Sequence, residues 1–213
     1  MFRYVATLLY AFSAVALGSS DDFDKVNGSI EIEPGREVGD VSTVNGSITI
    51  GSNARVQGVE TVNGRIRLEP GATAQSVETV NGSVTLGEGA VVSGNVEAVN
   101  GKLTLARDAR VDGRLENVNG DFLLQGAAVR GGLGTVNGDV LVGTGSRVDG
   151  GILVEKPEGW SWGGTSNRPR VTIESGAVVN GTLNFEREVD LYVGAAAVVG
   201  RVEGVEPRRY RLP

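Results

Sequence analysis

Apolar and polar residues alternate in short runs along most of this chain. Typical runs are Ile48-Thr49-Ile50 and Ala54-Arg55-Val56, in which apolar residues flank a polar one. A period of two is the pattern of β-strands with one buried face, whereas a helix repeats about every 3.6 residues. The pattern therefore predicts an all-β protein.

The runs repeat around the triplet Val-Asn-Gly, which occurs seven times. Successive triplets lie 18, 18, 18, 19, 19 and 18 residues apart. A fixed period of this size indicates a solenoid. Because Asn-Gly tolerates positive φ, each triplet is expected to form a tight corner. The asparagines of these structural corners, expected to stack as a hydrogen-bonded ladder, are Asn27, Asn45, Asn63, Asn81, Asn100, Asn119 and Asn137.

Each repeat carries three short apolar runs separated by corners, for example 48–50, 54–56 and 59–61. This predicts a single-stranded, three-faced (triangular) β-helix with about nine coils of 18–19 residues, spanning residues 26–205. No coil can bury its apolar side alone, so stability must come from the stacking of neighbouring coils.

Residues 1–18 have the pattern of a secretory signal peptide. Arg3 precedes an apolar run, and small residues at Ala16 and Gly18 offer cleavage sites. The alternative is an uncleaved N-terminal anchor, although the run is shorter than the ~20 residues of a spanning helix. A cleaved signal predicts a periplasmic or secreted protein without a transmembrane span. Residues 19–25 form a short polar lead-in to the first coil.

The segment 155–170 interrupts the repeat and contains both tryptophans, Trp160 and Trp162. It takes the place of one Val-Asn-Gly corner, and the strand pattern resumes at Val171. Val179-Asn180-Gly181 belongs by register to a different corner and is not an eighth triplet.

An outward column of otherwise polar residues turns apolar at Leu123 and Leu141 near this insertion. Two interpretations remain open. The loop folds back so that its indoles cover the two leucines, which we favour, or Trp160, Trp162 and the nearby Tyr192 stay exposed and contact a glycan or protein partner.

The two ends of the solenoid are expected to differ. The basic tail 206–213 carries prolines and arginines, which blunt a sheet edge against pairing. The first coil offers Val26, Ile30 and Ile32 with little cover. We therefore expect self-association through the N-terminal edge, as a closed head-to-head dimer.

Composition narrows the possible functions. The 33 glycines recur at fixed positions, which indicates repeated turns rather than disorder. A net charge of −6 argues against a nucleic-acid partner. The chain has no Cys and no His, so it lacks thiolate metal ligands and the usual general base of hexapeptide-repeat acyltransferases. We expect no cofactor and no enzymatic activity.

Two charged sets lie on outward positions. Glu60, Glu78, Glu97 and Glu116 share one position in consecutive coils. Such a column could hold Ca²⁺, but a solvated acidic stripe is the simpler interpretation. The second set is expected to form cross-strand ion pairs of modest value. It consists of Arg110, Asp112, Arg130, Arg147 and Asp149.

The stretches GSVTLGEGAVVSGNVEAVNGKLTLARDARVDGRL (82–115) and VTIESGAVVNGTL (171–183) resemble the repeats of bactofilins, the bacterial polymer-forming cytoskeletal family. The likeness covers roughly residues 40–200 and implies a right-handed three-faced β-helix with possible end-to-end assembly. A signal peptide and an aromatic insertion depart from that family. The corner Val-Asn-Gly-Ser-Ile is also similar to adhesin-type β-solenoids of bacterial envelopes.

Together these features predict a non-enzymatic scaffold or assembly protein of a bacterial envelope. The alternative is an adhesin-like binding module that uses the Trp-containing loop to contact glycan or protein.

Overall fold

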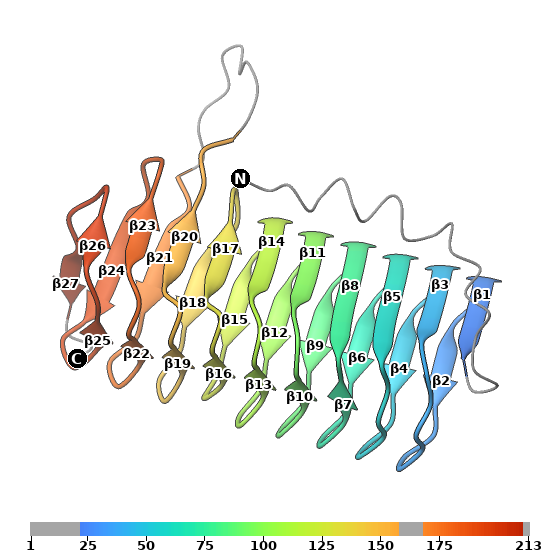
Figure 1. Cartoon of the computed structure of the whole chain (residues 1–213). Coiled ribbons are helices and arrows are strands. Elements are labelled where there is room, and N and C mark those ends of the chain that lie inside the picture. Colours follow the sequence, from blue (N-terminus) through green and yellow to red (C-terminus); the bar gives the residue numbers. More distant parts are fainter. Residues whose placement is uncertain (1–21, 158–167, 211–213) are drawn as a thin grey trace.

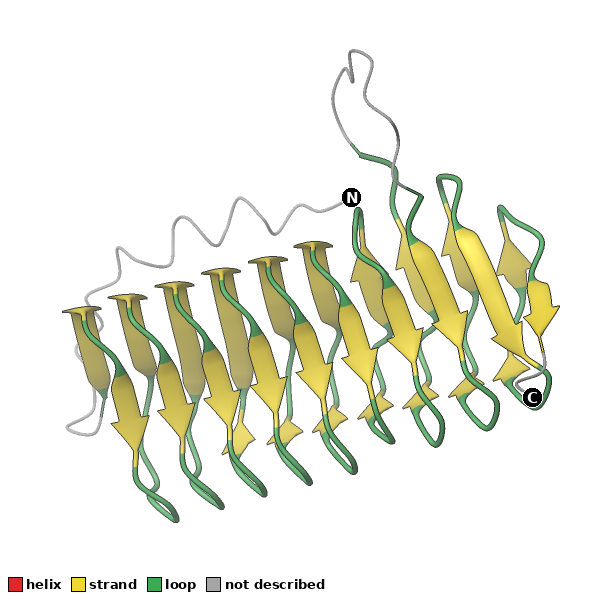
Figure 2. Ribbon diagram, turned by 180° about the vertical axis from the view of Figure 1, so that it is seen from behind, coloured by secondary structure: helices red, strands yellow, loops and turns green. Residues whose placement is uncertain are grey.

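The computed structural model of the chain describes residues 22–157 and 168–210. Throughout these residues the chain forms strands and turns, wound into a solenoid of about nine turns (Figures 1 and 2). Each complete turn supplies strands to parallel sheets that run along the solenoid, here called sheets A, B and C in chain order. The predicted all-β, three-faced β-helix is therefore confirmed.

Sheets A and B each have ten strands and sheet C has seven. Sheet A comprises β1 (Phe23–Asn27), β3 (Val41–Asn45), β5 (Gly58–Asn63), β8 (Ser76–Asn81), β11 (Val96–Asn100), β14 (Leu115–Asn119), β17 (Leu133–Thr135), β20 (Ile152–Val154), β23 (Leu183–Phe185) and β26 (Val202–Glu203). Sheet B comprises β2 (Ile30–Ile32), β4 (Ile48–Ile50), β6 (Ile66–Leu68), β9 (Val84–Leu86), β12 (Leu103–Leu105), β15 (Phe122–Leu124), β18 (Val140–Val142), β21 (Arg170–Ile173), β24 (Asp190–Gly194) and β27 (Arg208–Tyr210). Sheet C comprises β7 (Thr73–Ala74), β10 (Val91–Val92), β13 (Arg110–Val111), β16 (Ala128–Val129), β19 (Arg147–Val148), β22 (Val178–Val179) and β25 (Val198–Val199).

Equivalent residues of successive coils stack directly on one another. Ile48 pairs with Ile30 on one side and with Ile66 on the other. The register survives the insertion, because Val171 of β21 pairs with Val140 of β18. Val179 pairs with Val148 in sheet C, so the triplet that begins at Val179 lies at a different corner from the other seven, as its register predicts.

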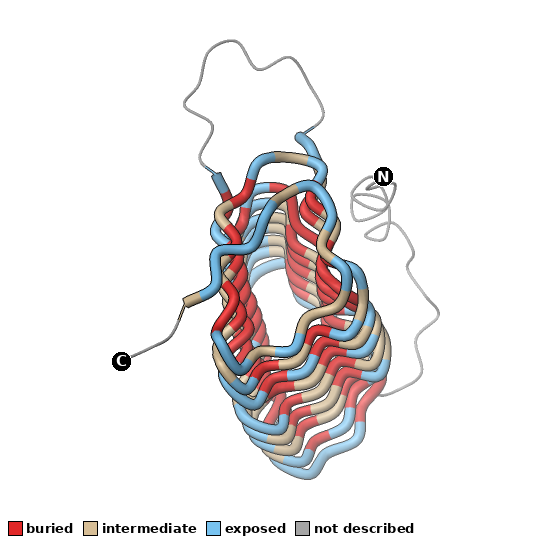
Figure 3. Tube along the Cα trace, turned by 90° about the vertical axis from the view of Figure 1, so that its left-hand side faces the viewer, coloured by how far each residue is buried: buried red, intermediate tan, exposed pale blue. Residues whose placement is uncertain are grey.

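The core is a set of inward apolar columns that run the length of the solenoid. Viewed along its axis, buried positions alternate with more exposed ones around each turn (Figure 3). Sheet B supplies columns such as Ile48, Ile66 and Leu103, all fully buried. A parallel in-register sheet keeps each column on one face, because side chains alternate with a period of two.

The solenoid extends further at both ends than the hydrophobic pattern indicates. β1 begins at Phe23, inside the expected lead-in, because Phe23 packs against the core in register with Val41. β27 lies inside the expected basic tail and pairs with β24. In the described part of the chain there is no helix long and apolar enough to cross a bilayer.

Candidate functional site

The seven corner asparagines form one continuous hydrogen-bonded column at the exposed corner between sheets A and B. In every step, Nδ2 of the later asparagine donates to Oδ1 of the earlier one, at distances between 2.8 and 3.1 Å. These are the bonds that the triplet spacing predicts. Such a ladder fixes the register of each coil on the next.

The glycine of each triplet is required by contact between coils more than by turn geometry. Only Gly28 (φ 108°) and Gly101 (φ 146°) have a φ in the left-handed region. A Cβ on Gly82 would meet the carbonyl oxygen of Gly64, and the same clash recurs along the column. At the other five corners φ lies outside the left-handed region, and close stacking of the coils selects glycine there.

Arg187 occupies the C-terminal end of the asparagine ladder. Its Nη1 donates to Oδ1 of Asn137 at 2.7 Å and to the backbone oxygen of Val136 at 2.9 Å. The insertion replaces the next corner, so no eighth asparagine is available to fill this position. Sequence reasoning missed this residue, whose one signal was an arginine in the corner segment after β23, the next corner after the insertion.

A second polar column lies on the inward side of sheet A, two residues before the asparagines in the same strands. Thr43, Thr61 and Thr79 are fully buried at in-register positions of sheet A. The Thr61 hydroxyl donates to the backbone oxygen of Gly46 at 3.0 Å. Each such bond ties a coil to the glycine corner of the coil before it, which the hydrophobic pattern did not reveal.

The four glutamates form the outward column that their spacing predicts. Glu78 pairs in register with Glu60 and Glu97, and Glu97 pairs with Glu116. Partial burial raises the pKa of Glu78, and the neighbouring carboxylates of Glu97 and Glu60 raise it further. Two polar partners lie along this column: Asn95 donates to Glu97 at 3.2 Å, and the Arg114 guanidinium lies 2.8 Å from Glu116.

The pKa values of the glutamates at both ends of this column are also raised. Burial raises the pKa of Glu60, and Asp24 and Asp40 add to the increase. Burial also raises the pKa of Glu116, while Arg114 opposes the shift. Within residues 22–157 and 168–210, no three acidic, His or Cys side chains are grouped as they would be to hold a metal ion. The carboxylates follow one another along the sheet rather than converging on a point.

The outer face of sheet C carries ion pairs, of which Arg130–Asp112 is the expected cross-strand kind and Arg110–Asp112 and Arg147–Asp149 lie within one coil. Asp112 lies between Arg110, at 3.1 Å, and Arg130 of the next coil, at 2.9 Å. Arg147 pairs with Asp149 at 2.8 Å. A hydrogen bond from Asn180, together with Arg147, lowers the pKa of Asp149. These exposed pairs contribute little stability each.

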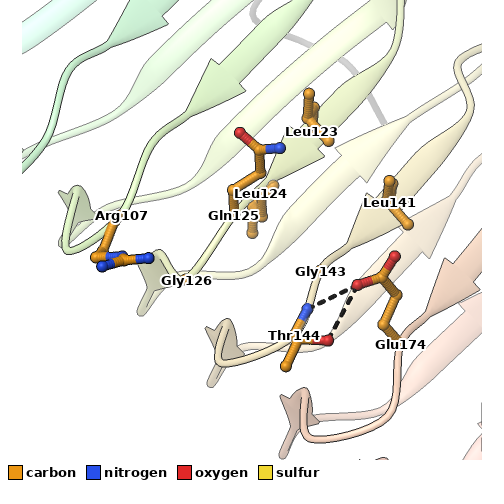
Figure 4. A pocket seen from close by; sticks show the side chains of 9 residues that line it. All are labelled: Arg107, Leu123, Leu124, Gln125, Gly126, Leu141, Gly143, Thr144 and Glu174. Atoms are coloured by element: carbon orange, nitrogen blue, oxygen red, sulfur yellow. Dashed lines mark hydrogen bonds between the residues drawn. The ribbon is translucent and has the colours of Figure 1, made fainter.

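A hollow on the described surface lies on sheet B around Leu123 and Leu141. It has a volume of about 440 Å³, and Figure 4 shows Leu123, Leu141, Arg107 and Glu174 among the residues that line it. Glu174 accepts hydrogen bonds from the backbone nitrogen and the hydroxyl of Thr144 at 2.9 and 3.1 Å. A second hollow of about 260 Å³ shares both leucines. This apolar pair is the one that the sequence places near the insertion.

Trp160 and Trp162 lie outside the described residues, so neither interpretation of the aromatic loop is tested by the structure. Tyr192 is half-buried, and the Arg208 guanidinium lies 5.9 Å from its ring centroid. Arg208 Nη1 also lies 3.5 Å from the Tyr192 hydroxyl. Strand β27 therefore contacts Tyr192, the residue that one of the two interpretations assigns to a partner contact.

The two ends of the solenoid expose different side chains. At the N-terminal end Ile30 and Ile32 are buried, contrary to the expectation of little cover, while Val26 is 66% exposed. At the C-terminal end Val198 is 57% exposed. There β27 places the exposed Arg209 in register with the buried Val193, and charged residues on an edge strand discourage further pairing.

No protein-family model, curated protein or solved structure matches this chain. The functional proposal therefore rests on the geometry of the solenoid.

Proposed function

We propose that this chain is a non-enzymatic scaffold or assembly element of a bacterial envelope. The observation that carries the proposal is the in-register stacking of equivalent residues in successive coils, best seen in the six-step asparagine ladder. Such a surface offers rows of identical groups along a stiff rod. An enzyme instead gathers different groups around one reacting atom.

Assembly is proposed to proceed through the N-terminal edge. Strands β1 and β2 are the first strands of sheets A and B, and each is paired on one side only within the described chain. Val26 is exposed beside this edge, whereas the opposite end carries the arginines of β27. An open edge with an apolar side chain favours pairing with a second copy, and one usable edge gives a closed dimer rather than a filament.

The proposal includes export across the inner membrane, on the pattern of residues 1–18. Cell fractionation tests it directly. The mature chain, cut after Ala16 or Gly18, is expected in the periplasm or culture medium. A full-length chain that stays in the cytoplasm would contradict the envelope location.

Particle length tests the assembly. Ten strands at ~4.8 Å spacing give a rod of roughly 45 Å, so a head-to-head dimer should be about twice as long. Small-angle X-ray scattering of the purified protein measures this dimension. Rods of single length at every concentration would contradict assembly, and rods of unlimited length would contradict a closed dimer.

A binding module is the second candidate, favoured by the apolar pair Leu123 and Leu141 beside two hollows on sheet B. If the chain is a binding module, the face of sheet B next to the insertion contacts envelope glycan or a protein. Co-sedimentation with purified peptidoglycan, compared between wild type and a Leu123→Ser/Leu141→Ser variant, distinguishes the candidates. Binding that the variant loses would favour the module over the scaffold.

A further inference from the structure

Asn-Gly sequences are open to attack by their own backbone, because glycine has no side chain to hinder the approach. The glycine nitrogen gives its proton to solvent and bonds to Cγ of the asparagine, and the side-chain nitrogen leaves as ammonia. Water then opens the resulting succinimide to aspartate or isoaspartate. The net reaction consumes one water and releases one ammonia. With seven exposed Asn-Gly corners in this chain, local geometry decides which of them react.

Most corners hold the attacking nitrogen in a hydrogen bond to the next coil. Gly28 donates its N–H to the backbone oxygen of Asn45 at 2.9 Å, and Gly82 donates to that of Asn100 at 2.9 Å. Gly46, Gly64 and Gly101 make the same bond. A glycine N–H that is hydrogen-bonded to the next coil points away from the side chain of the preceding asparagine. This hydrogen bond must break before the nitrogen can attack Cγ of that asparagine.

The corner at Gly138 uses a different acceptor. Its N–H donates to the buried hydroxyl oxygen of Thr135 at 3.1 Å. Thr135 belongs to the inward polar column of sheet A, in register with Asn117 of the preceding coil. This corner is therefore also held, by a side chain instead of a carbonyl.

Gly120 is the exception, since its N–H meets no acceptor within the described residues. The pairing of β14 with β17 stops at Thr135, and the backbone nitrogen of Asn137 donates to Val118. The carbonyl that would accept from Gly120 is thus out of register. The side chain beneath does not compensate: Asn117 directs Nδ2 to the oxygen of Gly101 at 2.5 Å.

At the same corner, the side chain of Asn117 also lacks one hydrogen bond. Its Oδ1 is buried and has no hydrogen-bond partner in the described part of the chain. A threonine at this position could accept from Gly120 as Thr135 accepts from Gly138. The corner of this coil therefore combines a free backbone donor with an unpaired buried acceptor.

We propose that Asn119–Gly120 is a site of spontaneous covalent modification, at which the folded protein converts asparagine to aspartate or isoaspartate. The other six corners are protected by their held glycine nitrogens. A carboxylate at position 119 cannot donate to Asn100, so the reaction breaks the ladder at one rung. The modification would place a negative charge in the middle of a neutral column.

Site-resolved mass spectrometry of the full-length folded chain tests the proposal. After incubation in mildly alkaline buffer, proteolytic peptides report amide-to-carboxyl conversion at each of the seven corners. Asn119 is expected to react at least about tenfold faster than Asn81, which corresponds to ~1.4 kcal/mol of additional opening free energy at the protected corner. In denaturant the seven rates should become similar, because the dipeptide is the same.

The matched variant is Asn117→Thr, which introduces at this corner the kind of hydroxyl that Thr135 uses to hold Gly138. It should slow conversion at Asn119 to the rate seen at Asn81 and leave the other five corners unchanged. Equal rates at all corners of the folded wild type would overturn the proposal, as would a fastest reaction at Asn27. So would an Asn117→Thr variant that folds normally by circular dichroism and still converts Asn119 at the wild-type rate.

Discussion

Nη1 of Arg187 donates a 2.7 Å hydrogen bond to Oδ1 of Asn137, across 50 residues of sequence. This bond occupies the last acceptor of the asparagine ladder. At the other end, Nδ2 of Asn27 has no acceptor among the described residues. All the side-chain amides between these ends point the same way, so each bond can strengthen its neighbours.

Position in the ladder should decide what each asparagine contributes. Asn81 has partners on both sides and Asn27 on one. Asn81→Ala is expected to lower the free energy of unfolding by about 1 kcal/mol more than Asn27→Ala, the order of one hydrogen bond. Chemical denaturation of both variants measures the difference. Equal losses would argue against a cooperative ladder.

Loss of the Arg187 guanidinium, which ends the asparagine ladder, should destabilise the corner next to the insertion. Arg187→Ala loses two hydrogen bonds to one corner, so we expect about 1–2 kcal/mol of destabilisation. Arg65→Ala, which removes an exposed side chain elsewhere at the same corner, is the matched control. The role assigned to Arg187 fails if the two variants unfold at the same denaturant concentration.

Coil stacking should make the corner glycines intolerant of any side chain. Gly82→Ala places a Cβ against the carbonyl oxygen of Gly64, and backbone on both sides prevents relief. We expect a loss at the upper end of the ~1–3 kcal/mol that is typical of overpacked sites. Thr85→Ala, on the outer face of sheet B in the same coil, is the control because it places alanine where no coil-to-coil clash arises. A Gly82→Ala variant as stable as this control would contradict the tight stacking.

The acidic column predicts how stability depends on pH. The pKa values of Glu60, Glu78 and Glu116 are raised in the folded chain, so the folded state binds protons more tightly than the unfolded state. This contribution is fully present below the ordinary glutamate pKa of ~4.3 and is lost as pH rises through the raised values. Unfolding free energy should therefore increase on acidification from neutral pH toward about 5.

Glu78→Gln isolates this effect. The neutral side chain removes the like-charge repulsion, so the variant should be more stable than wild type at neutral pH and less dependent on pH. Glu31→Gln, on the outer face of sheet B, is the control. If the unfolding free energy of Glu78→Gln depends on pH as that of the wild type does, the charge of the glutamate column does not affect stability. Addition of millimolar calcium during the same melts tests the alternative of a metal-filled column, which requires a rise in melting temperature.

The coil, its three faces and the asparagine ladder follow from the sequence because they repeat. A period of 18 or 19 residues places equal residues on equal positions, and the pairing of Ile48 with Ile66 is a direct consequence. Features that occur once have no such signal. The bond from Arg187 to Asn137 depends on how the chain returns after the insertion, which no local pattern specifies.

The ends of the solenoid were the least predictable part. The hydrophobic pattern indicates little cover for Ile30 and Ile32, yet both are buried. Strand β27 contains two arginines and follows a proline, a composition that indicates a tail. It pairs nonetheless, because the edge of β24 offers unsatisfied backbone groups that a short extended segment can occupy.

Light scattering across a concentration series tests the assembly proposal most directly, with Val26→Asp and Val198→Asp compared against wild type. These two valines are similarly exposed, at 66% and 57%, but lie at opposite ends of the rod. The account predicts that wild type and Val198→Asp rise to twice the monomer mass and then level off, while Val26→Asp remains monomeric. A wild type that stays monomeric, a mass that keeps growing, or loss of the dimer in Val198→Asp alone would contradict it.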